Sequence, residues 1–199
     1  MTRSTTQAMH LRRAGQFLRD FARDRTAAVG LVMLIAVVLA AVFAPLIAPQ
    51  DPYDLMTLDI MDGRLPPGST SFSGQVYFLG TDTQGRDMLS AILYGLRISL
   101  LVGLGAAGLA FVIGTLAGLL AAYIGGRFET LIMRLVDLQL SFPTILAAML
   151  ILAFLGKGVT NVVLAIVIVE WAAYARTARG SALSVMRREY VEAARSLMI

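Results

Sequence analysis

The sequence has no cysteine and a single histidine, and these absences exclude several kinds of chemistry. Without cysteine the chain can form no disulfide framework, no cysteine-ligated iron–sulfur cluster and no thiol nucleophile. The one histidine, His10, lies in a basic N-terminal tail, so no histidine-based metal site or catalytic dyad can be assembled. We therefore predict no catalytic residue, no metal ligand and no cofactor.

Lysine is also scarce, and this excludes a nucleotide site of the P-loop type. A P-loop needs Gly-x-x-x-x-Gly-Lys-Ser/Thr to hold phosphates. The only lysine, Lys157, follows Gly156, but Ile151 and Gly158 occupy the positions of the first glycine and the hydroxyl residue. The chain is therefore not expected to be an enzyme, and ATP hydrolysis, if it is needed, must come from separate subunits.

Charged residues make up only 15% of the 199 residues, whereas 57% are hydrophobic and the mean hydropathy is +0.74. Soluble domains usually carry about 25% charged residues. This composition indicates a membrane protein, with the lipid bilayer as its surroundings. The net charge of +4 does not indicate nucleic acid, because its distribution fits membrane topology instead.

Four apolar segments have about the length that a helix needs to cross a bilayer, roughly 20 residues. They predict an all-α, polytopic membrane helix bundle. Gly156-Lys157-Gly158 is expected to form a tight turn between the last two spans, and Pro143 to kink the third. The expected spans cover residues 27–47, 98–124, 135–155 and 159–174.

The arginines predict the orientation, because cytoplasmic loops carry an excess of Lys and Arg. A path with the N-terminus inside places every basic cluster in the cytoplasm and an acidic loop outside. A cleavable signal peptide is the alternative reading of the first span, which is longer than a usual signal core. The expected parts are a basic cytoplasmic tail (1–26), the first span (27–47), an extracytoplasmic loop (48–97) and a core of three further spans with the terminal helix (98–199).

Two short segments outside the spans carry further expectations. The N-terminal tail reads either as a basic amphipathic helix on the anionic inner membrane face or as a solvated tail that only fixes topology. In the extracytoplasmic loop, residues 76–79 are expected to form a short strand.

Small side chains recur every four residues along the second span and form one stripe. In lipid, such a stripe lets helix backbones approach closely. Packing against another helix of the same chain is the favoured role. The stripe consists of Ala106, Ala110, Gly114, Gly118 and Ala122.

Two acidic residues fall within or near the last two spans. Asp137 is expected to pair with Arg134 three residues earlier, close to the cytoplasmic end of its span. Glu170 precedes Trp171 and is expected near the inner headgroup level. An ion relay through either acid is the less favoured alternative.

The end of the chain is a short, charged amphipathic helix that follows the last span. On a helical wheel Tyr190 shares a small apolar face with Ala193, Ala194 and Leu197, and the opposite face carries Arg188, Glu192 and Arg195. Such a helix is suited to dock in a groove of a partner. An ordinary surface helix is the alternative on this evidence alone.

A series of short motifs along nearly the whole chain resembles the second permease subunit of the dipeptide/oligopeptide/nickel class of bacterial ABC importers, with a MetI-like transmembrane fold. In order they are Phe43-Ala44-Pro45, Leu79-Gly80-Thr81-Asp82, Gly85-Arg86-Asp87, Tyr94-Gly95, Arg97-Ile98-Ser99-Leu100, Ile113-Gly114-Thr115, Gly125-Gly126, Met133-Arg134-Leu135-Val136-Asp137, Phe142-Pro143, Tyr174-Ala175-Arg176 and Glu189-Tyr190-Val191-Glu192-Ala193-Ala194-Arg195.

The resemblance implies a permease of the bacterial inner membrane that works by alternating access. Its implied partners are a second homologous permease subunit, two cytoplasmic ABC ATPase subunits and an extracytoplasmic substrate-binding protein, with no nucleic acid. The implied ATPase contacts are Glu189, Tyr190, Glu192, Ala193, Ala194, Arg195 and Leu197.

Two features depart from that family. Met198 stands where relatives usually have a turn-forming glycine, and relatives continue beyond the position of Ile199 into two further spans. We therefore expect four spans of six and an incomplete permease. A membrane scaffold or an ion-coupled secondary transporter remains the alternative function. Within the family, short peptides are the expected cargo, but nickel and other solutes remain open.

Overall fold

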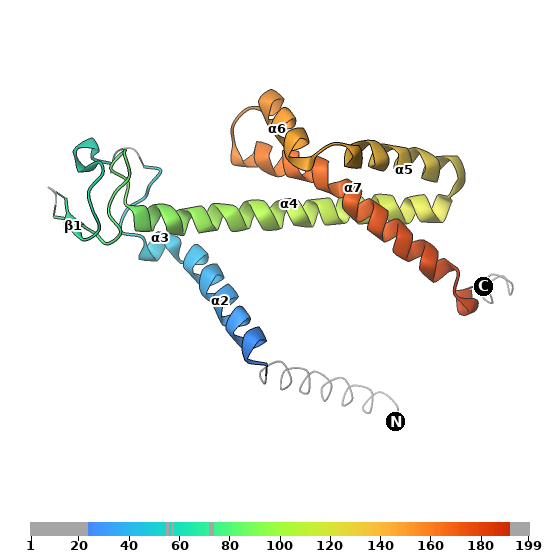
Figure 1. Ribbon diagram of the computed structural model, residues 1–199, viewed down its shortest axis with the longest axis horizontal. Helices are drawn as coiled ribbons and strands as arrows, with labels where there is room; N and C mark the ends of the chain where they lie inside the picture. Colours follow the sequence, from blue (N-terminus) through green and yellow to red (C-terminus); the bar gives the residue numbers. More distant parts are fainter. Residues whose placement is uncertain (1–23, 55, 57, 72–73, 192–199) are drawn as a thin grey trace. The chain divides into compact units, whose positions relative to one another are not determined.

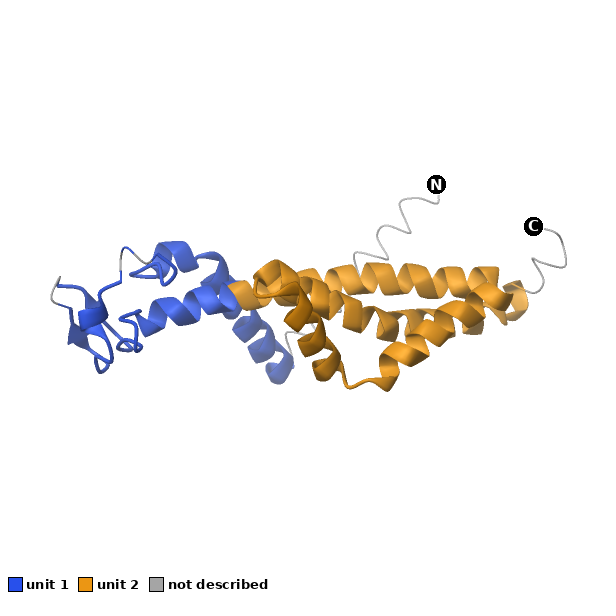
Figure 2. Cartoon of the chain, turned by 90° about the horizontal axis from the view of Figure 1, so that it is seen from above, with its two compact units in different colours: residues 1–97 blue, residues 98–199 orange. Residues whose placement is uncertain are grey.

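The computed structural model describes residues 24–54, 56, 58–71 and 74–191 (Figure 1). The chain forms two compact units, residues 1–97 and 98–199 (Figure 2). Helix α4 (Met88–Ile124) begins in the first unit and continues through the second. The helix expected in the N-terminal tail lies outside the described residues.

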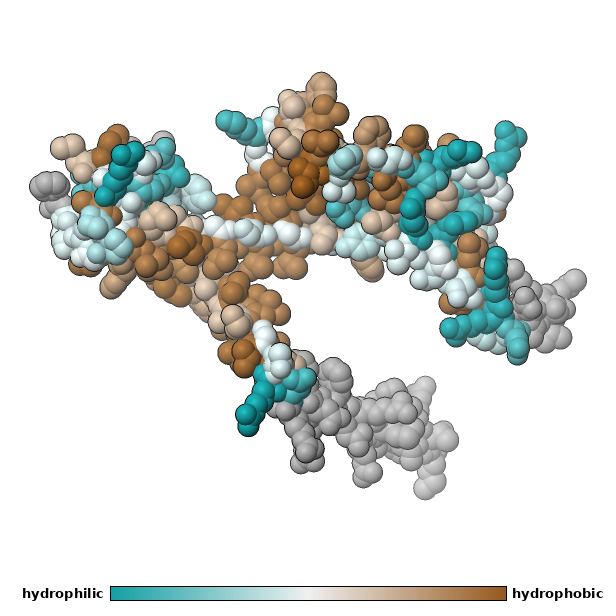
Figure 3. All heavy atoms as spheres, in the orientation of Figure 1, coloured by the Kyte–Doolittle hydropathy of each residue, from teal (hydrophilic) through white to brown (hydrophobic). Residues whose placement is uncertain are grey.

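The first unit begins with an apolar helix, α2 (Arg25–Val42), followed by the short α3 (Ala44–Ile47). Asp24 caps α2, and its carboxylate accepts hydrogen bonds from the backbone N–H groups of Thr26 at 2.9 Å and Ala27 at 3.3 Å. The helix breaks at Phe43, two residues before Pro45. Large apolar side chains are exposed along α2, and Figure 3 shows them in brown. A helix that exposes apolar groups in this way is suited to a lipid environment.

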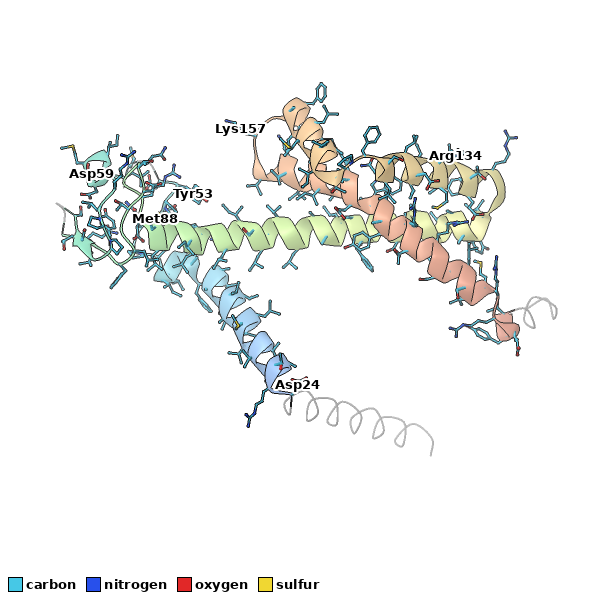
Figure 4. The ribbon with its side chains drawn as sticks, in the orientation of Figure 1. Asp24, Tyr53, Asp59, Met88, Arg134 and Lys157 are labelled. Atoms are coloured by element: carbon cyan, nitrogen blue, oxygen red, sulfur yellow. The ribbon has the colours of Figure 1, made fainter. Side chains whose placement is uncertain are left out.

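Residues 49–87 fold into a small lobe that contains a 3₁₀ turn, η1 (Ile60–Asp62), and two short strands. Strands β1 (Ser69–Thr70) and β2 (Val76–Tyr77) pair antiparallel, with Ser69 opposite Tyr77. The strand expected at 76–79 is thus present in its first half. Tyr53 and Asp59 lie in this lobe (Figure 4).

A buried hydrogen-bond network joins this lobe to the start of α4. Asp87 caps the helix, because its carboxylate accepts from the backbone N–H of Ser90 at 2.7 Å and from the Ser90 hydroxyl at 2.6 Å. The side-chain oxygen of Gln50 accepts from the N–H of Asp87 at 2.9 Å, and the N–H of Gln50 donates to the Ser90 hydroxyl at 3.2 Å. These bonds explain why α4 begins at Met88, before the predicted start of the span at residue 98.

The second unit contains the remainder of α4 and three further helices, α5 (Gly126–Ser141), α6 (Thr144–Leu155) and α7 (Val159–Met186). Glycines with positive φ separate them: Gly125 and Gly126 mark the start of α5, and Gly156 ends α6. Both α5 and α6 pack against α7.

The third predicted span is not one straight helix. Phe142 is extended and Pro143 lacks an N–H, so the helix stops at Ser141 and resumes at Thr144 after a bend of 94°. Three helices within the described residues are long and apolar enough to cross a membrane, or up to four if the bent pair α5–α6 is one span. The all-α class predicted from the sequence is confirmed.

The core of the second unit lies where α4, α5 and α7 meet. Val136 of α5 is fully buried against Ala172 and Ala175 of α7, and Ala117 of α4 packs beside them. Small residues on α7 allow this close approach, and α7 contacts each of the other helices of the second unit.

Candidate functional site

The two glycines of the small-residue stripe of α4 lie against α7. Each member of the stripe is buried, from Ala106 through Ala122. A Cβ added at Gly114 would lie 2.7 Å from the Cβ of Tyr174 and closer still to the carbonyl oxygen of Trp171. At Gly118 it would collide with the carbonyl oxygen of Ala175. Two glycines one turn apart thus let the backbones of α4 and α7 touch.

An aromatic contact lies beside this crossing. The rings of Phe111 on α4 and Tyr174 on α7 meet edge to face, with centroids 5.7 Å apart and an interplanar angle of 89°. Edge-to-face packing is a favourable geometry for aromatic rings. It fixes the rotation of the two helices about the glycine contact.

Two ion pairs join α5 to α7. Arg179 donates from Nε to Oε1 of Glu129 at 2.6 Å, and its Nη2 contacts the same oxygen. This pair is partly buried, with 33% of the arginine side chain and 23% of the glutamate exposed. The second pair joins Arg176 to Asp137 and is more open, with 52% and 64% exposed.

The prediction that Asp137 pairs with Arg134 is wrong. Asp137 pairs with Arg176 on the neighbouring helix and not with Arg134 on its own helix. Arg134 instead lines a shallow groove with Glu129 and Arg179, and Figure 4 marks it on α5. The local i, i+3 rule failed because the packing of α5 on α7 offers Asp137 a second arginine.

Glu170 lies on α7 between Val169 and Trp171 and is half-buried. Among the residues that the structure describes, its carboxylate has no hydrogen bond and no ion pair. Asp137 and Glu170, which were singled out together from the sequence, therefore stand in different environments.

The terminal segment is described only at its start. Helix α7 ends at Met186, the chain turns at Arg187 and Arg188, and helical structure resumes over residues 189–191. Tyr190 is 62% exposed, as a docking residue must be. The other predicted contacts, Glu192, Ala193, Ala194, Arg195 and Leu197, lie outside the described residues.

The buried centre of the small lobe formed by residues 49–87 was not anticipated from the sequence. Asp62 is only 1% exposed, and its carboxylate accepts hydrogen bonds from the hydroxyls of Tyr77 at 3.0 Å and of Ser71. Burial and the bond to Asp62 raise the pKa of the Tyr77 hydroxyl above its usual 10.0. The sequence did not indicate that Asp62 is buried, because the carboxylates of an acidic loop are usually exposed.

Acidic residues elsewhere do not converge in the same way. Within the described part of the chain, no three His, Cys, Asp or Glu residues are arranged to hold a metal ion.

Comparison with known proteins gives two matching families. Residues 114–198 match the family described as binding-protein-dependent transport system inner membrane component. Residues 13–67 match the N-terminal transmembrane domain of oligopeptide transport permease C. Between the two matches lie the second half of the small lobe and the first part of α4.

Three curated relatives show how far the similarity extends. The di/tripeptide transport system permease protein of Pseudomonas aeruginosa is 41% identical over 181 residues, which cover 90% of this chain and 58% of the relative. The dipeptide transport system permease protein of Haemophilus influenzae is 36% identical over 176 residues, covering 88% and 59%. The glutathione transport system permease protein of Pectobacterium atrosepticum is 36% identical over 182 residues, covering 92% and 58%. The chain thus spans well under two thirds of the length of these relatives.

Proposed function

Because this chain belongs to the family of binding-protein-dependent transport system inner membrane components, we propose that it acts as a transmembrane permease subunit of an ATP-driven importer. The solutes are short peptides or related small molecules, which cross the cytoplasmic membrane by alternating access. The observation that carries this proposal is similarity along about 90% of the chain to permeases whose names specify di- and tripeptides.

The proposed partners follow from the same likeness. A second permease subunit completes the pore, two ATPase subunits bind on the cytoplasmic side, and an extracytoplasmic binding protein delivers the solute. The chain has no P-loop of its own, so nucleotide hydrolysis belongs to the ATPase subunits. The bilayer surrounds the exposed apolar residues of α2, α4 and α6.

The proposed orientation places the N-terminus and the end of α7 in the cytoplasm. The charges support it, because arginines gather in the N-terminal tail and from Arg176 onward, whereas the small lobe is acidic. The turn that carries Lys157 then lies on the outer side. In this arrangement the segment from Glu189 to Leu197 is within reach of a cytoplasmic ATPase.

The role proposed for this terminal segment is mechanical. It docks in a cleft of the ATPase subunit and transmits the closure of the ATPase pair to α7, as a rigid-body movement between two states. The exposed ring of Tyr190 and the charge of Glu189 at the start of the segment suit such a contact.

Co-purification tests the function. The chain, expressed with its partner subunits, is expected to retain the ATPase subunits and to support ATP-dependent uptake. Glu192→Lys is expected to lose the ATPase while still inserting in the membrane. Lys157→Glu serves as the control, because it makes an equally large charge change at the opposite end of α7 and should retain the ATPase. Equal retention by both variants would contradict the docking role.

Two other results would replace the proposal. Uptake driven by a proton gradient without ATP would indicate a secondary transporter, and partner binding without any uptake would indicate a scaffold.

Labelling tests the orientation. The chain has no cysteine, so single cysteines can be introduced without background. A membrane-impermeant thiol reagent applied to intact cells is expected to label Lys157→Cys and to leave Arg188→Cys unlabelled. Labelling of Arg188→Cys from outside would refute the proposed topology and the docking role with it.

A further inference from the structure

Glu170 is an ionisable side chain inside a membrane-spanning helix, and the described part of the chain provides it with no partner. A charged side chain exposed to lipid near the centre of a bilayer costs about 2.5–3.5 kcal/mol or more. Such residues therefore usually face the interior of a bundle or a water-filled cavity.

The position of Glu170 along α7 places it well inside the span. The helix rises about 1.5 Å per residue, so Glu170 lies about 16 Å from Val159 and about 9 Å before Arg176. The hydrocarbon core is about 30 Å thick. With Arg176 near the inner boundary, this spacing places Glu170 deeper than the inner headgroup level at which the sequence led us to expect it.

The face of α7 that carries Glu170 differs from its other faces. At helical spacing it continues through exposed small or hydroxyl residues, Ala173, Thr177, Gly180, Ser181 and Ser184. No large apolar residue is exposed on this face after Glu170. Of the exposed large apolar residues of α7, Leu164 and Ile168 lie on another face of the helical wheel and Val185 lies beside this one. Val159 shares the face, but on the other side of Glu170 from Ala173.

The contacts of α7 with α4 and α5 do not use this face. Helix α4 meets α7 along Tyr174 and Ala175, and helix α5 meets it along Ala172 and its arginines. The face with Glu170 and Thr177 lies outside both contacts on the wheel, and the remaining neighbour of α7 is α6, which is joined to its first turn. The Thr177 hydroxyl donates to the carbonyl oxygen of Ala173 at 2.9 Å and so needs no other partner. The charge of Glu170 alone remains unmatched.

We propose that this face of α7 lines the aqueous translocation pathway and that Glu170 forms a site in it for the positively charged group of the solute, an alkylammonium. The proposal rests on the proposed transport function. The polar face runs from Glu170 to the cytoplasmic end of α7, which provides a route for water. On the outer side of Glu170 the same face carries Val163 and Ile166. Glu170 thus stands at the inner limit of an apolar barrier.

Charge complementarity selects the occupant. A carboxylate at the wall of this pathway attracts a cation and repels an anion equally. A free N-terminal ammonium or a lysine side chain fits this requirement, whereas a carboxylate group of the solute is directed away from Glu170. The site therefore orients a zwitterionic solute in the pathway.

A thiol-reaction assay tests this proposal without knowing the transported solute. In the natural cysteine-free chain, assembled with its partners, Ala173→Cys places one thiol a single helical turn from Glu170. Side chains three residues apart on a helix are neighbours, about 5–6 Å between Cβ atoms. Its reaction rates are measured with a cationic reagent, trimethylammonioethyl methanethiosulfonate, and with an anionic one, sulfonatoethyl methanethiosulfonate. The same rates are measured in the Glu170→Gln background.

Two results are expected. The thiol of Ala173→Cys reacts much faster than that of a control, Ile168→Cys, on another exposed face, because thiolate forms only in contact with water. The ratio of cationic to anionic rates falls about tenfold in the Glu170→Gln background, as removal of a unit charge at this distance implies.

Either of two other results would overturn the proposal. If the Ala173→Cys variant reacts no faster than the Ile168→Cys variant, the face is not aqueous. If the ratio of cationic to anionic rates is the same with and without the Glu170 carboxylate, Glu170 does not attract cations.

Retention of the ATPase subunits is measured on the same preparations. If the parent chain does not retain the ATPase subunits, the proposed function is contradicted. The ratio of cationic to anionic reaction rates would still report the charge of Glu170. The two failures are thus distinguishable.

Discussion

Replacing Gly118 by alanine tests whether the contact of α4 with α7 depends on the absence of a side chain. The added Cβ would meet the carbonyl oxygen of Ala175 at a distance that real structures do not show, and the Cβ of Ala178 at 3.0 Å. These neighbours are backbone or the first side-chain atom of α7, so they cannot rotate away. The two helices must separate instead.

The size of the effect follows from this separation. At Gly114 the added Cβ would stand 2.7 Å from the Cβ of Tyr174, whereas ordinary contact begins at 3.4 Å. A gap of about 0.5–1 Å already removes a quarter to a half of each contact energy along the seam. We expect Gly118→Ala and Gly114→Ala each to destabilise the protein by about 1–3 kcal/mol, the usual cost of overpacking.

The matched control lies on the same helix. A Cβ at Gly108 would meet nothing within 4 Å. Alanine is favoured over glycine in a helix interior by about 0.5–1 kcal/mol, so Gly108→Ala should be neutral or slightly stabilising. Thermal unfolding of the three variants in detergent, followed by loss of the monodisperse peak on gel filtration, measures the difference. Equal melting temperatures for Gly118→Ala and Gly108→Ala would refute the close crossing.

Three further predictions concern other contacts. A double-mutant cycle between Glu129 and Arg179 should give a coupling energy of about 1 kcal/mol in unfolding experiments, at the upper end for exposed pairs. The cycle between the more open Asp137 and Arg176 should give a smaller coupling energy, and the reverse order would contradict the described burial. Because the pKa of Tyr77 is raised in the folded state, its contribution to stability is complete below about pH 10 and is lost as pH rises through the folded pKa. The free energy of unfolding should therefore fall less steeply with rising pH in the Tyr77→Phe variant than in the parent chain. Parallel curves for the two proteins would exclude the buried hydroxyl as the cause. Gly80→Ala should destabilise the small lobe more than Gly68→Ala, because both glycines have positive φ but only Gly80 faces backbone atoms of Leu65 and Pro66; equal melting temperatures would show that backbone conformation alone matters.

The spans could be predicted from the sequence because apolar length is a local property. The boundaries were less accurate where polar residues take part in a helix. Helix α4 begins at Met88, well before the predicted span, because Asp87 and Ser90 cap it and Arg97 interrupts the apolar run without interrupting the helix. Pro143 located the break in the third span, but the bend of 94° depends on the extended backbone of Phe142, which the sequence does not specify.

Partners across helices could not be predicted, because they depend on how the helices pack. The small residues of α4 indicated a close approach, yet only the structure identifies the carbonyl groups of α7 as the surface they meet. Arg179 and Glu129 are 50 positions apart in the sequence, and no local rule connects them. The burial of Asp62 could not be predicted either, since its carboxylate is bound by hydroxyls from residues 9 and 15 positions away.

These contacts together make α7 the element through which a movement can spread in the second unit. Backbone contact at Gly114 and Gly118 joins it to α4, and the ion pair with Glu129 joins it to α5. Asn161 in its first turn donates to the carbonyl oxygens of Leu155 at 2.7 Å and Gly156 at 3.3 Å, which ties α7 to the end of α6. Because α7 is one continuous helix from Val159 to Met186, a displacement of its Met186 end must shift all three contacts or break one. Close packing resists breakage, so in the proposed mechanism a push on the segment that follows Arg188 would move these helices together, and Glu170 with them.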